Sequence, residues 1–161
     1  MKDLELLEKD GFQGFVTINE LRNNINIVPT YGGVYVVLRI KESKPVFLDK
    51  GTGGFFKKKD PNVSISKLEA KWIDDTHIVY IGKAKGSATR SLKIRLKEYM
   101  RFGQGESVAH RGGRYIWQLE DADDLIVCWK RIDSDAEQAE KQMILAFKEK
   151  YGKYPFANLR L

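Results

Sequence analysis

The spacing of hydrophobic residues predicts three β-strands. Residues 31–40 (YGGVYVVLRI) are rich in β-branched residues and show no helical period, which predicts a strand that begins after two glycines. Because successive side chains of a strand point to opposite faces, Tyr35 should face one side of the sheet and Val36 the other. Residues 77–83 (HIVYIGK) and 125–132 (LIVCWKRI) have the same character and predict two further strands.

Helical periodicity and capping signals predict five helices. A Ser or Thr followed three residues later by Glu is typical of a helix start, and this pattern occurs at Thr17, Ser66 and Ser134. Gly152 should end the last helix, because glycine readily adopts the left-handed conformation found there. The predicted helices cover residues 1–10, 18–23, 66–72, 91–101 and 134–150.

One acidic residue of the last predicted helix occupies a hydrophobic position. The apolar stripe of that helix is formed by Ala136, Met143, Ile144 and Phe147, and Glu140 lies within it. A carboxylate turned toward a core loses solvation and needs a cation, a metal or hydrogen-bond donors nearby. The ordinary alternative is a glutamate at the edge of the stripe that reaches water or pairs with a lysine. The helix alone leaves both interpretations open.

The helix predicted at 91–101 carries a partly sheltered arginine. Its apolar stripe consists of Leu92, Leu96, Tyr99 and Met100. Arg95 lies beside this stripe, one turn before Tyr99, whereas Lys93 and Lys97 fall on the solvent side. A planar, permanently charged guanidinium in such a place suits phosphate recognition. The alternative is a structural arginine that pairs with an acid.

Composition limits the class of protein. The chain has 161 residues, 42% hydrophobic and 31% charged, as is typical of one globular domain with its own core. No run is apolar enough for a membrane span, so we expect no membrane partner. The single cysteine, Cys128, cannot form an internal disulfide, which favours a cytoplasmic location. The absence of a Cys/His cluster in the sequence argues against structural zinc.

Charge is strongly polarised along the chain, whose formal net charge is +6. Residues 83–114 contain nine Lys or Arg and two acids, a net charge of +7, whereas residues 117–140 contain eight acids and two basic residues, a net charge of −6. This distribution indicates a polyanionic partner, with DNA first and RNA as the alternative, although many basic proteins only have solvated lysine-rich faces. Candidate contacts to the nucleic-acid backbone are Lys83, Lys85, Lys93, Arg111 and Arg114.

Two glycine-containing loops carry weaker signals. The stretch Gly51–Gly54 does not match a P-loop, so a plain loop is favoured over a phosphate cradle. Phe55 and Phe56 precede three lysines, a combination that suits nucleic-acid contact or an aromatic pair that attaches the loop to the core. His110 lies in the loop 103–113, where a histidine without a role is favoured over a phosphate contact.

The order of these residues resembles that of the GIY-YIG nuclease superfamily. Gly33-Val34-Tyr35 corresponds to its first motif, and Tyr80-Ile81-Gly82 matches the second letter by letter. Arg95 on the next helix, Glu140 on a later helix and Asn158 near the end follow in the same order. The stretch around Tyr80–Lys85 and Leu92–Tyr99 is most similar to the N-terminal nuclease domain of the excision-repair protein UvrC.

The resemblance implies a fold and an activity. It implies an α/β domain of the α+β type, with a small central three-stranded antiparallel sheet flanked by helices. It also implies hydrolysis of DNA phosphodiesters with one divalent metal, Mg²⁺ or Mn²⁺, in repair, restriction or mobile-element biology.

The resemblance also implies roles for individual residues. Tyr35, Tyr80 and Arg95 would be catalytic, and Glu140 would be catalytic and hold the metal. Gly33 and Gly82 would be the motif glycines, and the residues lining the substrate site would include Lys83, Tyr99 and Asn158. A tyrosine base needs a lowered pKa, which a metal, Lys83 or Arg95 could provide; Tyr35 is our first choice, and Tyr80 is the alternative.

The chain departs from this pattern in its accessory segments. We expect a single domain over residues 1–161, with the core at about 31–158, accessory helices in 1–30 and an insertion at 41–76, because 44 residues separate Tyr35 from Tyr80. The alternatives to a nuclease are a non-catalytic nucleic-acid-binding module and a protein-interaction domain that uses the insertion. Cutting both strands of a duplex usually needs a second unit, so a homodimer remains an option.

Overall fold

The computed structural model describes residues 2–159, and its centre is an antiparallel sheet. In these residues the sheet has four strands in the order β1-β4-β2-β3. They are β1 (Gln13–Thr17), β4 (Ile126–Arg131), β2 (Gly33–Leu38) and β3 (Ile78–Ala84). The strands predicted from the hydrophobic pattern are confirmed as β2, β3 and β4. The α+β class is confirmed, and β3 forms one edge of the sheet.

The expected three-stranded sheet is wrong, because β1 adds a fourth strand on the edge beyond β4. Its register with β4 is interrupted between Gly14 and Val16, where Phe15 has a φ of 56°. A glycine and a bulge in a strand of five partly exposed residues leave no clear alternation of hydrophobic positions. The N-terminal extension therefore contains a strand between its two helices and is not purely helical.

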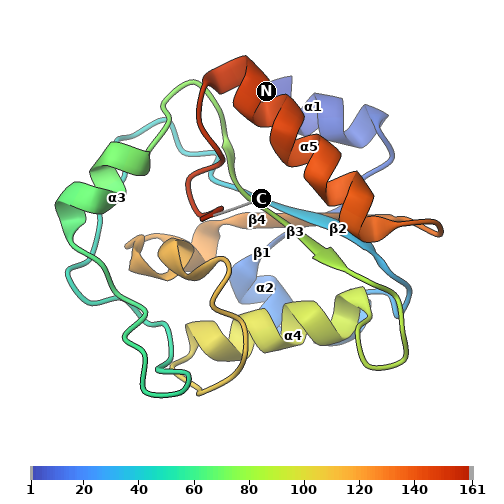
Figure 1. The fold of residues 1–161 in the computed structure, drawn as a ribbon, viewed down its shortest axis with the longest axis horizontal. Coiled ribbons are helices and arrows are strands. Elements are labelled where there is room, and N and C mark those ends of the chain that lie inside the picture. The colour runs from blue at the N-terminus through green and yellow to red at the C-terminus, as the bar shows by residue number, and fades with distance from the viewer. Residues whose placement is uncertain (1, 160–161) are drawn as a thin grey trace.

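Helices cover both faces of the sheet, as Figure 1 shows. On one face lie α2 (Ile18–Asn23) and α4 (Leu92–Gly103), whose buried residues join one core cluster with Tyr35. On the other face lie α1 (Lys2–Lys9) and α5 (Ala136–Tyr151), which contribute to a second cluster with Val36. The predicted alternation of β2 side chains is thus confirmed, and all six β2 residues are buried.

The helix starts are partly as predicted. Thr17 caps α2 by accepting a hydrogen bond from the Glu20 amide at 3.0 Å. The predicted caps Ser66 and Ser134 are wrong, because Ser64 caps α3 (Ile65–Lys71) and Asp135 caps α5. Several residues capable of capping precede each of these helices, and backbone conformation decides which one does so. No helix among the described residues has the length and apolar character needed to cross a membrane.

Three short 3-10 helices complete the described chain, namely η1 (Ile25–Ile27), η2 (Arg114–Gln118) and η3 (Ala122–Asp124). The last residue of η2, Gln118, attaches the insertion at 41–76 to the body of the protein. Its buried side-chain amide donates to the carbonyl oxygens of Leu48 at 3.0 Å and Val63 at 2.9 Å, and its side-chain oxygen accepts from the Val63 amide at 2.9 Å. A side chain at position 118 therefore fixes the base of a loop that begins more than 70 residues earlier.

The glycines of the stretch 51–54 allow the insertion to pack closely. A Cβ atom on Gly51 would lie 2.2 Å from the Trp117 carbonyl oxygen, and one on Gly54 would lie 2.0 Å from the Glu106 carbonyl oxygen. Neither approach is compatible with a side chain. The stretch is therefore a packed loop, as favoured from the sequence.

Candidate active site

A cavity of about 680 Å³ lies along the edge strand β3. Its walls come from β2, β3, α4, α5, the segment 109–114, the C-terminal segment and the insertion. The lining residues are Tyr35, Lys59, Tyr80, Lys83, Arg95, Ala109, His110, Arg111, Gly112, Arg114, Glu140, Ile144, Asn158 and Leu159. All four predicted catalytic residues therefore line one cavity, although they lie on four different elements.

The position of β3 at the sheet edge explains this convergence. Tyr80 belongs to the core cluster on the α4 side, whereas Ile81, the next residue, belongs to the cluster on the α5 side. Groups from both faces of a sheet can meet beyond its edge strand, where no further strand separates them. The cavity therefore receives Arg95 from the α4 side and Glu140 from the α5 side.

Gly82 gives Tyr35 its place in this cavity. The two residues are paired across β2 and β3, so they face the same side of the sheet. A Cβ atom on Gly82 would lie 2.3 Å from Cζ of Tyr35 and 2.5 Å from its hydroxyl oxygen. The Tyr35 ring thus occupies the space that a side chain at position 82 would need, and lies over β3.

Gly33 has a different structural role. A Cβ atom there would lie 2.0 Å from the carbonyl oxygen of Lys130 on β4. Gly33 therefore permits the close pairing of β2 with β4 at the start of the strand, and contributes to the site through this pairing.

Asn158 supports the site through the backbone. Its side-chain amide donates to the carbonyl oxygen of Ile81, and its side-chain oxygen accepts from the Ile81 amide, both at 2.9 Å. The amide of the preceding residue, Ala157, donates to the Val79 carbonyl oxygen at 2.8 Å. The C-terminal segment therefore hydrogen-bonds backbone groups at the free edge of β3 and holds in place the strand that carries Tyr80.

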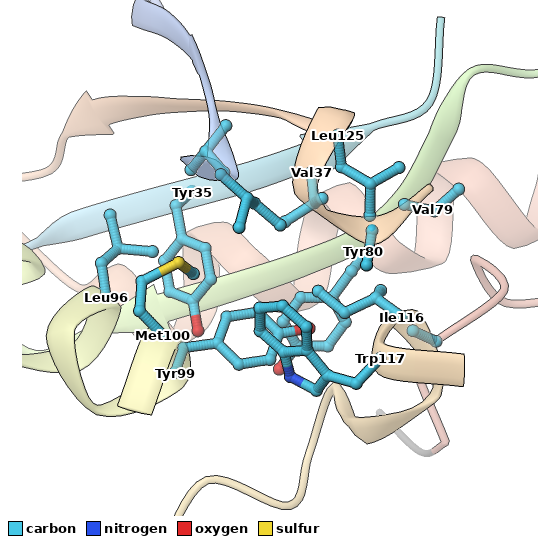
Figure 2. Close-up of a cluster of buried hydrophobic side chains, with 14 of the residues drawn as sticks. Tyr35, Val37, Val79, Tyr80, Leu96, Tyr99, Met100, Ile116, Trp117 and Leu125 are labelled. Carbon is cyan, nitrogen blue, oxygen red and sulfur yellow. The ribbon is translucent and has the colours of Figure 1, made fainter. Parts of the chain in front are cut away.

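Three tyrosines and a histidine form one aromatic cluster beside the cavity. Figure 2 shows Tyr35, Tyr80 and Tyr99 packed together among aliphatic side chains. The Tyr35 hydroxyl lies 3.0 Å from Nε2 of His110, and the His110 ring stacks on Tyr99 with centroids 4.0 Å apart. The Tyr99 hydroxyl donates to the Gly113 carbonyl oxygen at 2.6 Å. Tyr99, predicted to line the site, therefore supports it from behind and does not line the cavity.

Burial makes both site phenols weak acids. It raises the pKa of Tyr80 to about 12, and the charge of Glu140 acts in the same direction while Arg95 opposes it. Burial also raises the pKa of Tyr35 well above its usual range, with Tyr80 adding to this effect. Tyr80 keeps 7% of its surface exposed, whereas Tyr35 has none. Both phenols are therefore neutral at physiological pH in this structure.

His110 is a site residue for which the sequence favoured no role. It is buried, and burial together with the charge of Arg95 holds its pKa well below the usual range. Its Nδ1 atom is also buried and has no hydrogen-bond partner among residues 2–159. A single histidine in a glycine-rich loop gives no periodic or spacing signal, so only the folded loop could place it beside Tyr35.

Arg95 and Glu140 each have a partner within the protein. Nη1 of Arg95 lies 3.2 Å from Oε1 of Glu98, three residues along α4. Nζ of Lys83 lies 3.6 Å from Oε1 of Glu140, and its charge counteracts the rise that burial causes in the pKa of Glu140. Both ion pairs that the sequence left open as alternatives are thus present, and both lie at the cavity.

The cavity contains more positive than negative charge. Five of its lining residues are cationic, namely Lys59, Lys83, Arg95, Arg111 and Arg114. Glu140 is the one acid among the described lining residues. Lys59 comes from the insertion and is one of the three lysines after Phe56 that the sequence linked to nucleic-acid contact. Lys85 and Lys93, predicted as backbone contacts, lie outside the lining.

The donor set limits which metals could bind. No group of three or more His, Cys, Asp or Glu residues within the described chain could hold an ion. Among the described lining residues, the Glu140 carboxylate is the one anionic group. Mg²⁺ keeps several waters and binds proteins through one or two carboxylates, so this donor set fits Mg²⁺ or Mn²⁺ and does not fit zinc.

Comparisons of the chain with protein-family models, curated proteins and solved structures found no significant match. The side chains of the cavity define what it can do chemically. Its cationic side chains can bind an anion, its carboxylate can orient a hard cation, and its phenol and imidazole can pass a proton between them.

Proposed function

We propose that this protein is a metal-dependent endonuclease of the GIY-YIG type that hydrolyses DNA phosphodiester bonds. The observation that carries the proposal is the shared cavity of Tyr35, Tyr80, Arg95 and Glu140. Phosphodiester hydrolysis needs a bound phosphate, an activated water and stabilisation of the charge that develops on the phosphorus oxygens. Each of these tasks has a candidate group among the lining residues.

The cations of the cavity are suited to hold the phosphate. Arg95 has 22% of its side chain exposed, so its guanidinium is sheltered but still reachable. A guanidinium presents two parallel donors to phosphate oxygens, and this interaction strengthens as charge develops. In the free protein Glu98 occupies one of these donors, so a bound phosphate would replace Glu98 as the partner of Arg95.

Glu140 is the residue that would hold the metal. When bound, Mg²⁺ or Mn²⁺ would neutralise charge on the phosphate and favour deprotonation of water. Burial removes most of the water around the Glu140 carboxylate and raises its pKa, so the carboxylate gains from a cationic partner. Lys83 neutralises this carboxylate in the free protein, and would be released toward the phosphate when Glu140 gains another partner.

Tyr35 is the favoured general base because a proton acceptor lies behind it. Its hydroxyl can donate to Nε2 of His110 across 3.0 Å while it accepts a proton from water. This concerted transfer avoids a free phenolate, which the raised pKa of Tyr35 disfavours. It forms a buried imidazolium instead, which burial and the charge of Arg95 disfavour in the free protein. A phosphate bound to Arg95 would offset that charge and make His110 a better proton acceptor. Tyr80 would then position water or phosphate. If Tyr80 is the base instead, removing His110 should leave the chemical step unaffected.

A cleavage assay tests the proposal. Plasmid and branched DNA with Mg²⁺ or Mn²⁺ should be cut by the wild type, and Glu140→Gln or Arg95→Ala should reduce the rate by at least about 100-fold, as removal of one preorganised group does. The control is Glu149→Gln, which replaces an exposed acid on α5, the helix that carries Glu140, and should retain full activity. Absence of cutting on every substrate while DNA remains bound would refute the nuclease.

A second candidate is a non-catalytic nucleic-acid-binding module. It is favoured by the ion pairs Arg95–Glu98 and Lys83–Glu140, which satisfy the charged groups without substrate. Under this alternative Glu140→Gln would bind DNA as well as or better than the wild type, and no metal would produce cleavage.

A further inference from the structure

The middle of the insertion forms a basic, aromatic turn at Phe55–Lys59. Phe56 and Lys59 are paired, with the Lys59 amide donating to the Phe56 carbonyl oxygen at 3.1 Å. Between them Lys57 and Lys58 have φ values of 53° and 62°. Two consecutive left-handed residues are the signature of a type I′ turn, which strongly prefers Asn and Gly.

Turn chemistry therefore does not explain why lysines occupy these positions. Residues with a Cβ atom are disfavoured in the left-handed region, and Lys57 and Lys58 pack into no core, since both are exposed. What they add is two positive charges at the tip of the insertion. The exposed contact of Lys57 with the Phe56 ring is a small return for this conformational cost, which points to a role for these side chains outside the folded chain.

The Phe55–Lys59 turn is firmly attached to the loop that carries His110. The Ser107 hydroxyl donates to the Phe55 carbonyl oxygen at 2.9 Å, and Arg111 donates to the Lys59 carbonyl oxygen at 3.1 Å. In Figure 1 the two segments run side by side near the C-terminal end of α4. The turn is thus held as an extension of the cavity wall, in which Lys59 and Arg111 both take part.

The exposed groups of the turn combine aromatic surface with positive charge. Phe55 is 53% exposed, more than any other aromatic side chain among the described residues. It directly precedes Phe56, the first residue of the turn pair. Nζ of Lys57 lies 5.4 Å from the centroid of the Phe56 ring. An exposed phenyl ring with adjacent ammonium groups matches the faces and phosphates of unpaired nucleotides, whereas bases within a duplex keep their faces stacked on each other.

We propose that the Phe55–Lys59 turn binds unpaired nucleotides next to the phosphate held in the cavity. This inference rests on the proposed nuclease function and narrows its substrate to DNA with a single-stranded segment, such as a fork or flap. Phe55 stacks on a base, and Lys57 and Lys58 contact the phosphates on either side of it. Lys59 links the turn to the cavity.

Binding measurements without metal test the role of Phe55. Fluorescein-labelled blunt duplex and forked duplex of the same sequence are titrated in EDTA, and affinity is read from anisotropy. Phe55→Ala should weaken binding of the fork by about 5- to 150-fold, the range expected for loss of one stacked base, and leave the blunt duplex within about 2-fold. Leu145→Ala, which removes a similarly exposed hydrophobic side chain from α5, is the control and should change neither.

A turn replacement tests the lysines. Lys57→Asn with Lys58→Gly installs the residues that a type I′ turn prefers, so the melting temperature should rise by about 2 to 4 °C. Binding of the fork should nevertheless weaken. The slope of log affinity against log salt is negative, and its magnitude should decrease by about 1.4, the value for two phosphate contacts on a single strand. A more stable variant with unchanged affinity for the fork would overturn the proposal.

The outcomes separate this proposal from the nuclease itself. If Phe55→Ala binds both DNAs like the wild type, or loses affinity for both by the same factor, the proposed role of the turn is wrong. If the wild type cuts blunt and forked DNA alike and Phe55→Ala leaves both rates unchanged, the nuclease stands and the turn proposal fails. Fork-specific loss of binding without any cleavage would support the turn and refute the nuclease, and binding to no DNA would refute both.

Discussion

Glu98 lies close enough to Arg95 to compete with the phosphate of the proposed substrate for the Arg95 guanidinium. Their atoms are 3.2 Å apart, and the side chains are 22% and 25% exposed. Partly exposed ion pairs of this kind contribute little to stability, on the order of 0.2 to 1 kcal/mol. Replacing Glu98 should therefore leave the fold intact while it frees Arg95 for an anion.

We expect Glu98→Gln to bind DNA about two to five times more tightly than the wild type, which corresponds to the free energy of such a pair. Equilibrium binding at constant salt is the measurement. Glu149→Gln removes one negative charge far along α5 and controls for the change in net charge. Equal gains in both variants would mean that the Arg95–Glu98 pair does not compete with DNA.

His110 should make stability depend on pH. Burial lowers its pKa in the folded state well below the ordinary value of 6.5, so the unfolded chain binds the proton first as the pH falls. The free energy of unfolding should consequently decrease below pH 6.5, by at most about 1.4 kcal/mol per pH unit from this residue.

Urea titrations of the wild type and His110→Gln between pH 7.5 and 5 measure this effect. The wild type should lose more stability than the variant over this range. Comparing the two proteins cancels the contribution of Glu140, whose raised pKa acts in the opposite direction as the pH falls. Parallel pH profiles would show that His110 is not held neutral by burial.

The residues of the site differ in how visible they are in the sequence. Glu140 could be predicted because a carboxylate interrupts an apolar stripe, and burial of Glu140 is confirmed. Arg95 was visible for a similar reason, since it borders the stripe of its helix. His110 could not be predicted, because its place depends on how the loop 103–113 folds against β2 and α4.

At the scale of elements, the pairing of β2 with β3 determines the geometry of the site. Tyr35 lies directly opposite Gly82, and its ring fills the space where a side chain would be. A shift of one residue in this register would turn Tyr35 toward the α5 face. Glycine is therefore required at position 82, because the Tyr35 ring lies over β3 there.

Gly82→Ala should destabilise the protein by about 1 to 3 kcal/mol, because the added methyl group overlaps the Tyr35 ring and forces the strands or the ring to move. Chemical denaturation measures the change. In a Tyr35→Ala background the same substitution should have a much smaller effect, since the space is then free. A full effect in that background would mean that the strain lies in the backbone and not in the ring.

Other elements were less visible in the sequence. The strands β2, β3 and β4 are long, β-branched and largely buried, so their pattern is strong. Strand β1 contains Gly14 and is irregular, so its pairing partner decides its conformation. Similarly, the insertion has little periodicity of its own and is positioned by Gln118 from a distant part of the chain.

For the whole molecule, the distribution of charge predicts how binding responds to salt. The net charge is +6, and five cationic side chains surround the cavity. Each phosphate contact to a duplex releases counterions and contributes about 0.9 to the slope of log affinity against log salt.

We expect a slope of roughly −3 to −4.5 for duplex DNA, which corresponds to three to five phosphate contacts. Lys59→Ala should reduce the magnitude of the slope by about 1, because Lys59 lines the cavity. Lys9→Ala, on α1 and outside the cavity, should leave the slope unchanged. Affinity that does not respond to salt would contradict a backbone-binding mode.

The sequence by itself determined the elements with strong periodicity, the acid within an apolar stripe, the arginine beside another stripe and the polarised charge. These features depend on residues near one another along the chain, where the repeat of a helix or strand makes a misplaced residue visible. Only the tertiary structure decided that β3 lies at the sheet edge, where groups from both faces meet around one cavity. It also decided the partnership of His110 with Tyr35 and the attachment of the insertion to the cavity wall, because contacts between distant segments leave no periodic trace in the sequence.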